Sequence, residues 1–348
     1  MPLQMWKASR WGIRRSFRGD GKLRVGVGPV RTGVTAIFPR GKHDTVPVYA
    51  STFAQNGNGE MTGTAWIEEG GFAEGPILIT NTHSVGLVRD ATIKWQLRHW
   101  PKVIEDLEWS LPIVAETWDG YLNDINGFHV KDEDVFHALD EAHGGAVTEG
   151  AVGGGTGMVC YGFKGGIGTS SRKLDQKAGG YTVGVLVQCN CGRRAQLMIA
   201  GVPVGKEIPR DVPYARNDPR AGQDTGSIII IAATDAPLLP NQLKRIARRA
   251  TMGLARTGST SGNGSGDLFL AFSTAARITK TEGVSTVETL GNDSLNPLFE
   301  ATAQATEEAI VNAMVGADTA TGIDGHTVIG LPHAQLIQAL KKYNRYSE

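Results

Sequence analysis

Cysteine is scarce in this chain. Only three cysteines occur among 348 residues: Cys189 and Cys191 are two positions apart, and Cys160 lies well upstream. This spacing matches neither a disulfide framework nor a zinc site. The sequence therefore predicts no metal centre and a reducing compartment.

Net charge and long apolar runs are also absent. Lys+Arg and Asp+Glu both number 35, so no overall field attracts nucleic acid or an acidic membrane surface. No run approaches the roughly 18 apolar residues of a membrane span, and the first residues lack the apolar core of a signal peptide. We therefore expect a cytoplasmic protein with no nucleic-acid or membrane partner, whose ligands are selected by a local site.

Glycine, in contrast, is abundant. The chain has 46 glycines, about twice the usual share of roughly 7%, and they crowd together in residues 150–157 and 162–170. Neither stretch has the order of a phosphate-binding loop or of a dinucleotide fingerprint. We expect close approach of backbones around a site, and no organic cofactor.

Hydrophobic patterning predicts an α+β protein. Strands are predicted over 34–38, 46–53, 63–68, 181–189, 195–202, 226–233, 268–272 and 279–289, and a strand followed by a helix over 77–88. The Asn-Gly turn at 56–59 predicts a hairpin between the second and third strands. Helices are predicted over about 132–142, 237–254, 296–314 and 332–343.

The order of these elements indicates a stacked sheet core with outer helices, because strands do not alternate regularly with helices. We expect one catalytic domain over 23–348 after a peripheral arm over 1–22. Residues 101–145 are interpreted as a lid or an edge insertion, and residues 205–225 as a mobile loop.

One short stretch points to chemistry. Residues 262–267 read GNGSGD and precede the apolar run LFLAF at 268–272. Glycines permit unusual backbone geometry, and the buried strand behind them would hold Ser265 in place. This arrangement is one way to mount a reactive hydroxyl, although a glycine-rich turn leading into a core strand has the same pattern.

Five motifs in one order resemble a known family. They are NGNGEMTGT (56–64), ITNTHSVG (79–86), YGFKGGIGTSSR (161–172), GSGD (264–267) and ATEEAI (305–310). Together they resemble the L-aminopeptidase/D-amidase-D-esterase family, which includes the β-peptidyl aminopeptidases. The resemblance implies a four-layer αββα sandwich, like that of the N-terminal nucleophile hydrolases but with different connectivity. It also implies self-cleavage between Gly264 and Ser265 into associated α (1–264) and β (265–348) chains.

The resemblance implies roles for further residues. Ser265 would be the nucleophile and its new α-amine the base, with Asp267 a candidate for orienting that amine or a simple cap at the start of the strand. Tyr161 and Asn190 match the positions that bind the developing oxyanion. The family pattern has Ala and Tyr where this chain has Cys189 and Cys191, which alters the expected shape of the pocket.

A second set of implied residues supports the nucleophile. Thr306 and Glu308 match the family's pair of a hydroxyl and a carboxylate. Residues two apart do not share a helix face, so Glu307 is the reserve candidate for the carboxylate. Because an aminopeptidase must bind a free ammonium, Glu149 and Glu68, the latter beside Trp66, are candidates for substrate binding.

The sequence therefore predicts an autoprocessed serine aminopeptidase or amidase. It would act on short peptides, amides or esters through an acyl-enzyme on Ser265, without a cofactor, as a homo-oligomer of αβ units (a tetramer or larger). Two alternatives remain open: an acyltransferase like ornithine acetyltransferase, and a non-catalytic homologue that is never processed.

Overall fold

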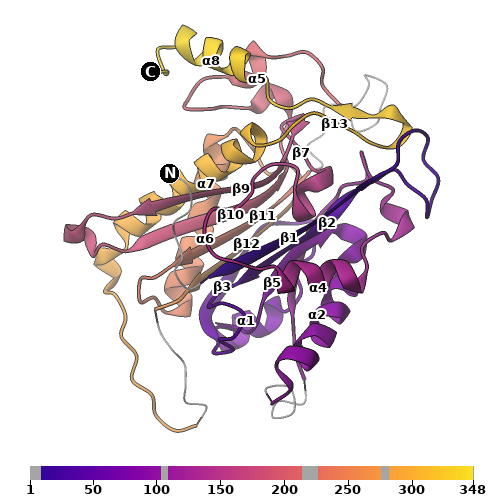
Figure 1. Cartoon of the computed structure of the whole chain (residues 1–348). Helices are drawn as coiled ribbons and strands as arrows, with labels where there is room; N and C mark the ends of the chain where they lie inside the picture. Colours follow the sequence, from indigo (N-terminus) through magenta and orange to yellow (C-terminus); the bar gives the residue numbers. More distant parts are fainter. Residues whose placement is uncertain (1–8, 103–108, 214–225, 276–281, 348) are drawn as a thin grey trace.

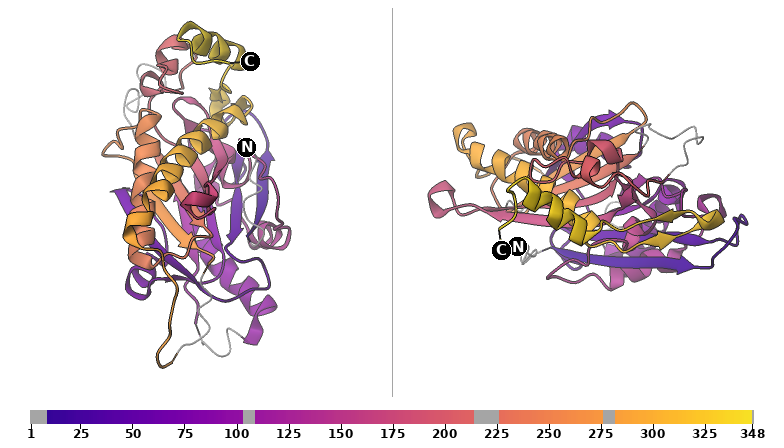
Figure 2. Two further views of the ribbon diagram at one scale, coloured as in Figure 1. Left: turned by 90° about the vertical axis from the view of Figure 1, so that its left-hand side faces the viewer. Right: turned by 90° about the horizontal axis from the view of Figure 1, so that it is seen from above.

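The computed structural model describes residues 9–102, 109–213, 226–275 and 282–347. Two β-sheets stack face to face, and helices cover the outer face of each sheet (Figure 1). The view from above in Figure 2 shows the order helices, sheet, sheet, helices. This four-layer αββα arrangement confirms the α+β sandwich predicted from the sequence.

One sheet has four strands in the order β1-β2-β5-β6. They are β1 (Arg10–Arg18), β2 (Val30–Phe38), β5 (Ile77–Asn81) and β6 (Ile113–Thr117). The pairs β1·β2 and β2·β5 are antiparallel, whereas β5 and β6 run parallel. β5 and β6 are buried at every position, as expected of strands covered on both faces.

The other sheet has six strands in the order β4-β3-β12-β11-β10-β9. They are β4 (Phe72–Ala73), β3 (Val48–Gly57), β12 (Gly266–Ser273), β11 (Ser227–Thr234), β10 (Thr182–Asn190) and β9 (Gly166–Lys173). The two central strands, β11 and β12, are parallel, and the other neighbours pair antiparallel. β12 is thus held on both sides by strands that precede it in the chain.

Alternation along β12 fills two cores. Phe269 and Ala271 pack in the core beneath the outer helices, whereas Leu270 and Phe272 pack in the core between the two sheets. Successive side chains of a strand point to opposite faces, so an unbroken apolar run is what this central position requires.

Helices α6 (Pro240–Arg256) and α7 (Asn296–Val315) cover the six-stranded sheet, and α2 (Val85–His99) and α4 (Asp132–Asp140) cover the four-stranded sheet. Both α6 and α7 carry a proline in their first turn, where its missing N–H leaves no helix bond unmade. The remaining helices and strands are α1 (Thr64–Gly70), β7 (Val159–Cys160), β8 (Phe163–Lys164), α5 (Val204–Glu207), β13 (Ala320–Thr321), β14 (Thr327–Val328) and α8 (His333–Lys342).

Most predicted elements are confirmed. They are the strands over 34–38, 46–53, 181–189, 226–233 and 268–272, the strand and helix of 77–88, and the helices over 132–142, 237–254, 296–314 and 332–343. Their boundaries differ by a few residues.

The strand predicted over 63–68 is wrong, and so is the hairpin before it. Gly63 has φ +76° and leads into helix α1 instead. The Asn-Gly turn at 56–59 ends β3, whose partners are β12 and β4, with Gly57 opposite Gly266. Pairing with a strand far along the chain overrides the local hairpin signal.

The strand predicted over 195–202 is also wrong. β10 already has β9 on one side and β11 on the other, so no edge is left for a further partner. The chain forms a short 3₁₀ turn at Arg194–Gln196 and a single bridge between Ile199 and Val202. The strand predicted over 279–289 begins outside the described residues, and its described part, 282–289, contains no strand.

The structure also describes parts of the three segments interpreted as an arm, a lid or edge insertion, and a mobile loop. Residues 10–18 of the expected arm form β1, paired along its whole length with β2, and residues 1–8 lie outside the described part. Residues 101–145 supply β6 and α4. The expected loop over 205–225 begins within α5, and residues 214–225 lie outside the described part.

The glycine-rich stretches bring backbones close together, as predicted. A Cβ on Gly155 would lie 2.6 Å from the Cα of Gly166, and one on Gly150 would lie 1.9 Å from the carbonyl oxygen of Gly316. Among the described residues, none of the helices is both long and apolar enough to span a membrane.

Candidate active site

Ser265 lies at the end of a tight turn, directly before β12. Its side chain is buried, with 1% of the residue exposed. The hydroxyl donates a 2.6 Å hydrogen bond to Oδ1 of Asp267, which is fully buried, and the Ser265 N–H donates to the carbonyl of Gly262 at 2.8 Å. The hydroxyl is therefore in contact with a carboxylate that can accept its proton.

Two asparagines at the end of β3 hold the loop before Ser265. Nδ2 of Asn58 donates to the carbonyl oxygen of Gly264 at 2.8 Å. Nδ2 of Asn56 donates to the carbonyls of Gly262 and Asn263 at 3.1 and 3.2 Å, and also to that of Ser265. The carbonyls on both sides of the Ser265 nitrogen and Cα are thus fixed by side-chain amides.

Gly266 makes this approach possible. A Cβ at Gly266 would lie 2.4 Å from the carbonyl oxygen of Asn58, a backbone atom that cannot turn away. The motif GSGD therefore needs its second glycine for contact with the segment that carries Asn58.

Tyr161 packs at the same end of the sheet. It has φ +51°, is completely buried, and its hydroxyl shares a 2.7 Å hydrogen bond with Oγ1 of Thr257. Its N–H donates to the carbonyl of Cys191 at 2.7 Å. Thr257 follows α6, so the phenol is tied to the chain segment that leads to Ser265.

Asn190 ends β10 and is level with the start of β12, because it pairs with Ser227 and Ser227 pairs with Gly266. Two strand spacings make its backbone about 10 Å from that of Gly266. Its amide donates to the carbonyl of Trp118 at 3.0 Å and accepts from the N–H of Val159 at 2.7 Å. In this uncut chain both the nitrogen and the oxygen of the Asn190 side-chain amide therefore have hydrogen-bond partners.

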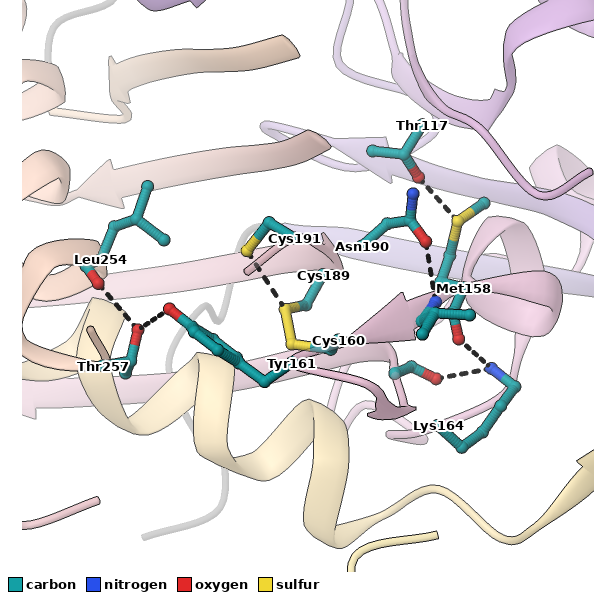
Figure 3. Close-up of a disulfide and its surroundings, with 12 residues drawn as sticks. Thr117, Met158, Cys160, Tyr161, Lys164, Cys189, Asn190, Cys191, Leu254 and Thr257 are labelled. Atoms are coloured by element: carbon teal, nitrogen blue, oxygen red, sulfur yellow. Dashed lines mark hydrogen bonds between the residues drawn. A yellow bond between two sulfur atoms is a disulfide. The ribbon is translucent and has the colours of Figure 1, made fainter. Parts of the chain in front are cut away.

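A disulfide links the segments that carry these two residues. Cys160, directly before Tyr161, is bonded to Cys189, directly before Asn190, and Sγ of Cys191 lies 3.8 Å from that of Cys189 (Figure 3). The prediction that the cysteines form no disulfide is therefore wrong. Sequence spacing failed here because the two cysteines, 29 residues apart in the chain, lie on strands of different sheets and meet only in the folded protein. The three sulfurs lie within 4.8 Å of one another, a spacing that suits a metal only if the disulfide is open.

A cavity of about 610 Å³ opens beside Asn190. Its wall includes Trp118, Val159, Asn190 and the segment from Cys191 to Gln196. Nε2 of Gln196 donates to Oγ1 of Thr260 at 3.2 Å, so the chain segment before Ser265 contacts one residue of the cavity wall.

Two buried ionisable residues, Lys164 and Asp119, lie near residues of this cavity wall. Nζ of Lys164 donates to the carbonyls of Met158 and Gly165 at 2.7 and 2.8 Å (Figure 3 shows the first), and burial lowers the pKa of Lys164 to about 7. Burial raises the pKa of Asp119 to about 7, against hydrogen bonds to its carboxylate that lower it. Neither side chain lines the cavity.

Comparison with known proteins identifies the family. The model of peptidase family S58 matches residues 17–328. The chain belongs to peptidase family S58. As a member of this family it is an enzyme, a hydrolase of the aminopeptidase class that acts on peptide bonds.

Family S58 relatives match almost the whole chain. A β-peptidyl aminopeptidase of Sphingosinicella microcystinivorans is 54% identical over 338 residues, which are 94% of this chain and 84% of the relative. The L-aminopeptidase D-Ala-esterase/amidase of Ochrobactrum anthropi, a solved structure described as a prototype of the serine aminopeptidases and a variant of the Ntn hydrolase fold, is 43% identical with a TM-score of 0.90. That match covers 98% of this chain and 93% of the other. A β-aminopeptidase from Burkholderia sp. is 44% identical with a TM-score of 0.83, covering 96% and 92%.

The Thr306 and Glu308 pair expected from the S58 resemblance lies elsewhere in this structure. Oγ1 of Thr306 donates to the carbonyl of Thr302 within α7. Glu308 accepts from Ser170 at 2.7 Å and pairs with Arg172 at 2.5 Å. Burial alone would raise the pKa of Glu308, but these two partners together lower it.

Sheet register shows how far Glu308 is from the nucleophile. Its partner Ser170 lies on β9, level with Ala271 of β12, three strands across and five residues beyond Gly266. With about 3.3 Å per residue and about 4.8 Å per strand, the Ser170 and Gly266 backbones are on the order of 20 Å apart. Glu307, the reserve candidate, faces Arg256 at 3.4 Å. Within this chain the structure does not bring Glu308 to Ser265.

Glu149 lies with Glu308 rather than with Ser265. Its Oε1 accepts from the N–H and the hydroxyl of Thr169 on β9, at 2.8 and 2.5 Å. Burial raises the pKa of Glu149, the bonds from Thr169 lower it, and the charge of Glu308 raises it further.

Glu68 lines a different cavity, of about 690 Å³, whose wall also includes Gly57 and Gly59 beside the start of β12. The carboxylate accepts from Thr52 and pairs with Lys244. Burial alone would raise the pKa of Glu68, but these partners lower it. Trp66 is partly exposed and packs edge-on against Trp109, with the ring centroids 6.3 Å apart. Of the two candidate carboxylates, Glu68 is therefore the one whose cavity reaches the Ser265 end of β12.

Sequence reasoning missed Asn56 and Asn58, which it assigned to a hairpin turn. A usable signal was present: two asparagines alternate with two glycines in one of the five family motifs, where a simple turn needs only one Asn-Gly pair.

Proposed function

We propose that this chain cuts its own Gly264–Ser265 bond and then releases the N-terminal residue of short peptides, amides or esters through an acyl-enzyme on Ser265. One observation carries the proposal. Ser265 is a buried serine directly before the central strand β12, so a cut there would leave its free amine one residue before a rigid strand. Membership of family S58 supports the same reading.

In the cut enzyme Ser265 supplies both nucleophile and base. An α-amine has an unperturbed pKa of about 7.7–8.0, so a useful fraction is neutral near pH 7 and can accept the proton from Oγ. The attack on the substrate carbonyl creates an oxyanion, for which Tyr161 and Asn190 are the proposed donors. Asn190 lines the 610 Å³ cavity, which supports placing the substrate there.

The substrate class follows from the relatives. One of them is named a β-peptidyl aminopeptidase and another a β-aminopeptidase, which supports short peptides with an N-terminal β-amino acid as the first substrates to test. The register of β3 limits the Glu68 candidate for the substrate ammonium: its carboxylate accepts from Thr52, opposite Leu270, and so lies four residues along β12 from Gly266, about 13 Å away, which exceeds the span of one amino-acid residue.

The two pieces of the cut chain would remain together. β12 of the small piece pairs with β3 and β11 of the large piece, and α7 packs on β9 and β10. We also propose that such αβ units assemble into a homo-oligomer of four or more, which light scattering on the purified enzyme would test.

Intact mass and N-terminal sequencing test the proposal directly. The wild type should give pieces 1–264 and 265–348 and hydrolyse a β-alanyl dipeptide, whereas Ser265→Ala should remain whole and inactive. Ser261→Ala, a serine in the same segment, is the matched control and should be cut and active. A folded wild type that stays whole would leave Ser265 without its amine and would refute the proposal.

A further inference from the structure

The contacts around the Gly264–Ser265 peptide assign roles beyond the nucleophile itself. Two side chains of the uncut chain touch the atoms that would react: Nδ2 of Asn58 lies 2.8 Å from the Gly264 carbonyl oxygen, and Oδ1 of Asp267 lies 2.6 Å from the Ser265 hydroxyl. We propose that Asn58, Ser265 and Asp267 form a self-cleavage centre that is distinct from the groups used on substrates. This inference rests on the proposed self-cleavage.

The reaction in this centre balances. Asp267 takes the proton of the Ser265 hydroxyl, and Oγ forms a bond to the carbonyl carbon of Gly264. Negative charge collects on the carbonyl oxygen, where the Asn58 amide donates its hydrogen bond. The bond from that carbon to the Ser265 nitrogen then breaks, and the nitrogen takes the proton back from Asp267. The product is an ester with a free amine; water hydrolyses it to the Gly264 carboxylate and the Ser265 hydroxyl.

Local structure favours this geometry. The register between β3 and β12 shifts between Asp267 and Leu268, which sets Asn56 opposite Asp267 and Gly57 opposite Gly266. A bulge of this kind re-aims side chains at the end of a strand. Asn56 then holds the carbonyls before and after the reacting bond and acts as a positioning residue.

Tyr161 and Asn190 have other contacts in the uncut chain. Both ends of the Asn190 amide are bonded, to Trp118 and Val159, and the Tyr161 hydroxyl is bonded to Thr257. Self-cleavage therefore uses its own oxyanion donor, and the donors for substrates can differ from it.

The test follows cleavage of the full chain after pulse-labelled cell-free synthesis. Asn58→Leu removes the hydrogen-bond donor and keeps the size of the side chain, so it should slow cleavage on the order of 10²-fold. This is the lower end of the rate loss usually caused by removing an oxyanion donor, because Asn58 is exposed and water partly replaces its amide. Asp267→Asn should leave the chain whole. Asn263→Leu makes the same change at an exposed asparagine next to the bond, and should be cut within a few-fold of the wild-type rate.

Two readouts separate chemistry from a structural effect. Asn58→Asp has the shape of asparagine but donates only when protonated, so its rate relative to wild type should rise as the pH falls toward about 4. Hydroxylamine, which attacks esters, should not rescue Asn58→Leu, because the slowed step precedes the ester. Rescue by hydroxylamine, or a flat ratio for Asn58→Asp, would overturn the role of Asn58.

The outcomes distinguish this inference from the proposed function. If the folded wild type is never cut, the proposed self-cleavage fails and the centre fails with it. If the wild type is cut and Asn58→Leu is cut equally fast, only the assignment of Asn58 fails. Cleavage of Asp267→Asn at the wild-type rate would likewise remove Asp267 from the centre.

Discussion

Two polar regions meet at the same end of the six-stranded sheet and are built in opposite ways. The Ser265 region is a glycine-rich loop held by hydrogen bonds from Asn56 and Asn58, with no covalent tie. The Tyr161–Asn190 region is tied by the Cys160–Cys189 disulfide, and both ends of the Asn190 amide are bonded. In the first region a bond is proposed to break, whereas the second forms the fixed wall of a cavity.

Of three changes that test this contrast, Gly266→Ala should slow self-cleavage the most. The new Cβ would meet the Asn58 backbone at 2.4 Å, and relieving such a contact typically costs 1–3 kcal/mol, so self-cleavage should slow by up to about 10²-fold. Gly57→Ala is the matched control, because a Cβ there meets nothing within 4 Å. Cleavage is followed by intact mass, and equal rates for the two variants would contradict the close packing of the Ser265 region.

Opening the disulfide should affect the stability of the fold, with less effect on self-cleavage than Gly266→Ala. The double change Cys160→Ser and Cys189→Ser should lower the free energy of unfolding by about 2–4 kcal/mol, as measured by urea unfolding of the uncleaved Ser265→Ala chain. Cys191→Ser in the same background serves as the control and should cost less. If the double variant unfolds at the same urea concentration as that control, the Tyr161–Asn190 region does not depend on its covalent tie.

The smallest effect is expected from Glu308→Gln, outside both regions. The side chains of the Glu308–Arg172 pair are each 32% exposed, and ion pairs in contact with solvent are worth about 0–1 kcal/mol. With the Gly266 backbone about 20 Å from that of Ser170, the partner of Glu308, the rate of self-cleavage should stay within a few-fold of wild type. If the Glu308→Gln chain is not cut, the motif that contains Glu308 on α7 acts on Ser265. The Ser265 and Tyr161–Asn190 regions would then not contain every residue that cleavage requires.

Patterns that depend on neighbours in the sequence predicted much of this fold. The apolar runs of β11 and β12 and the 3.6-residue period of α6 were enough to place them, because burial decides those residues. The hairpin after residue 56 and the strand over 195–202 failed because their outcome depends on which distant strand occupies the neighbouring edge of the sheet.

The site was predictable to a different extent. The GSGD motif located Ser265, since glycines around one serine before a buried strand are informative by themselves. The disulfide, and the contacts of Asn58 with the residue before Ser265, join segments 29 and 206 residues apart. No local pattern encodes such distances, and the position of Glu308 beside the far strand β9 depends equally on the packing of α7 over that strand.

The position of β12 also constrains how an active enzyme can be made. A strand inserted between β3 and β11 cannot be added to a finished sheet without separating two established neighbours. Expressing the segment from Ser265 onward as a separate polypeptide would therefore be a poor route to the enzyme. A single gene product, folded before it is cut, supplies both pieces in equal number and already in register.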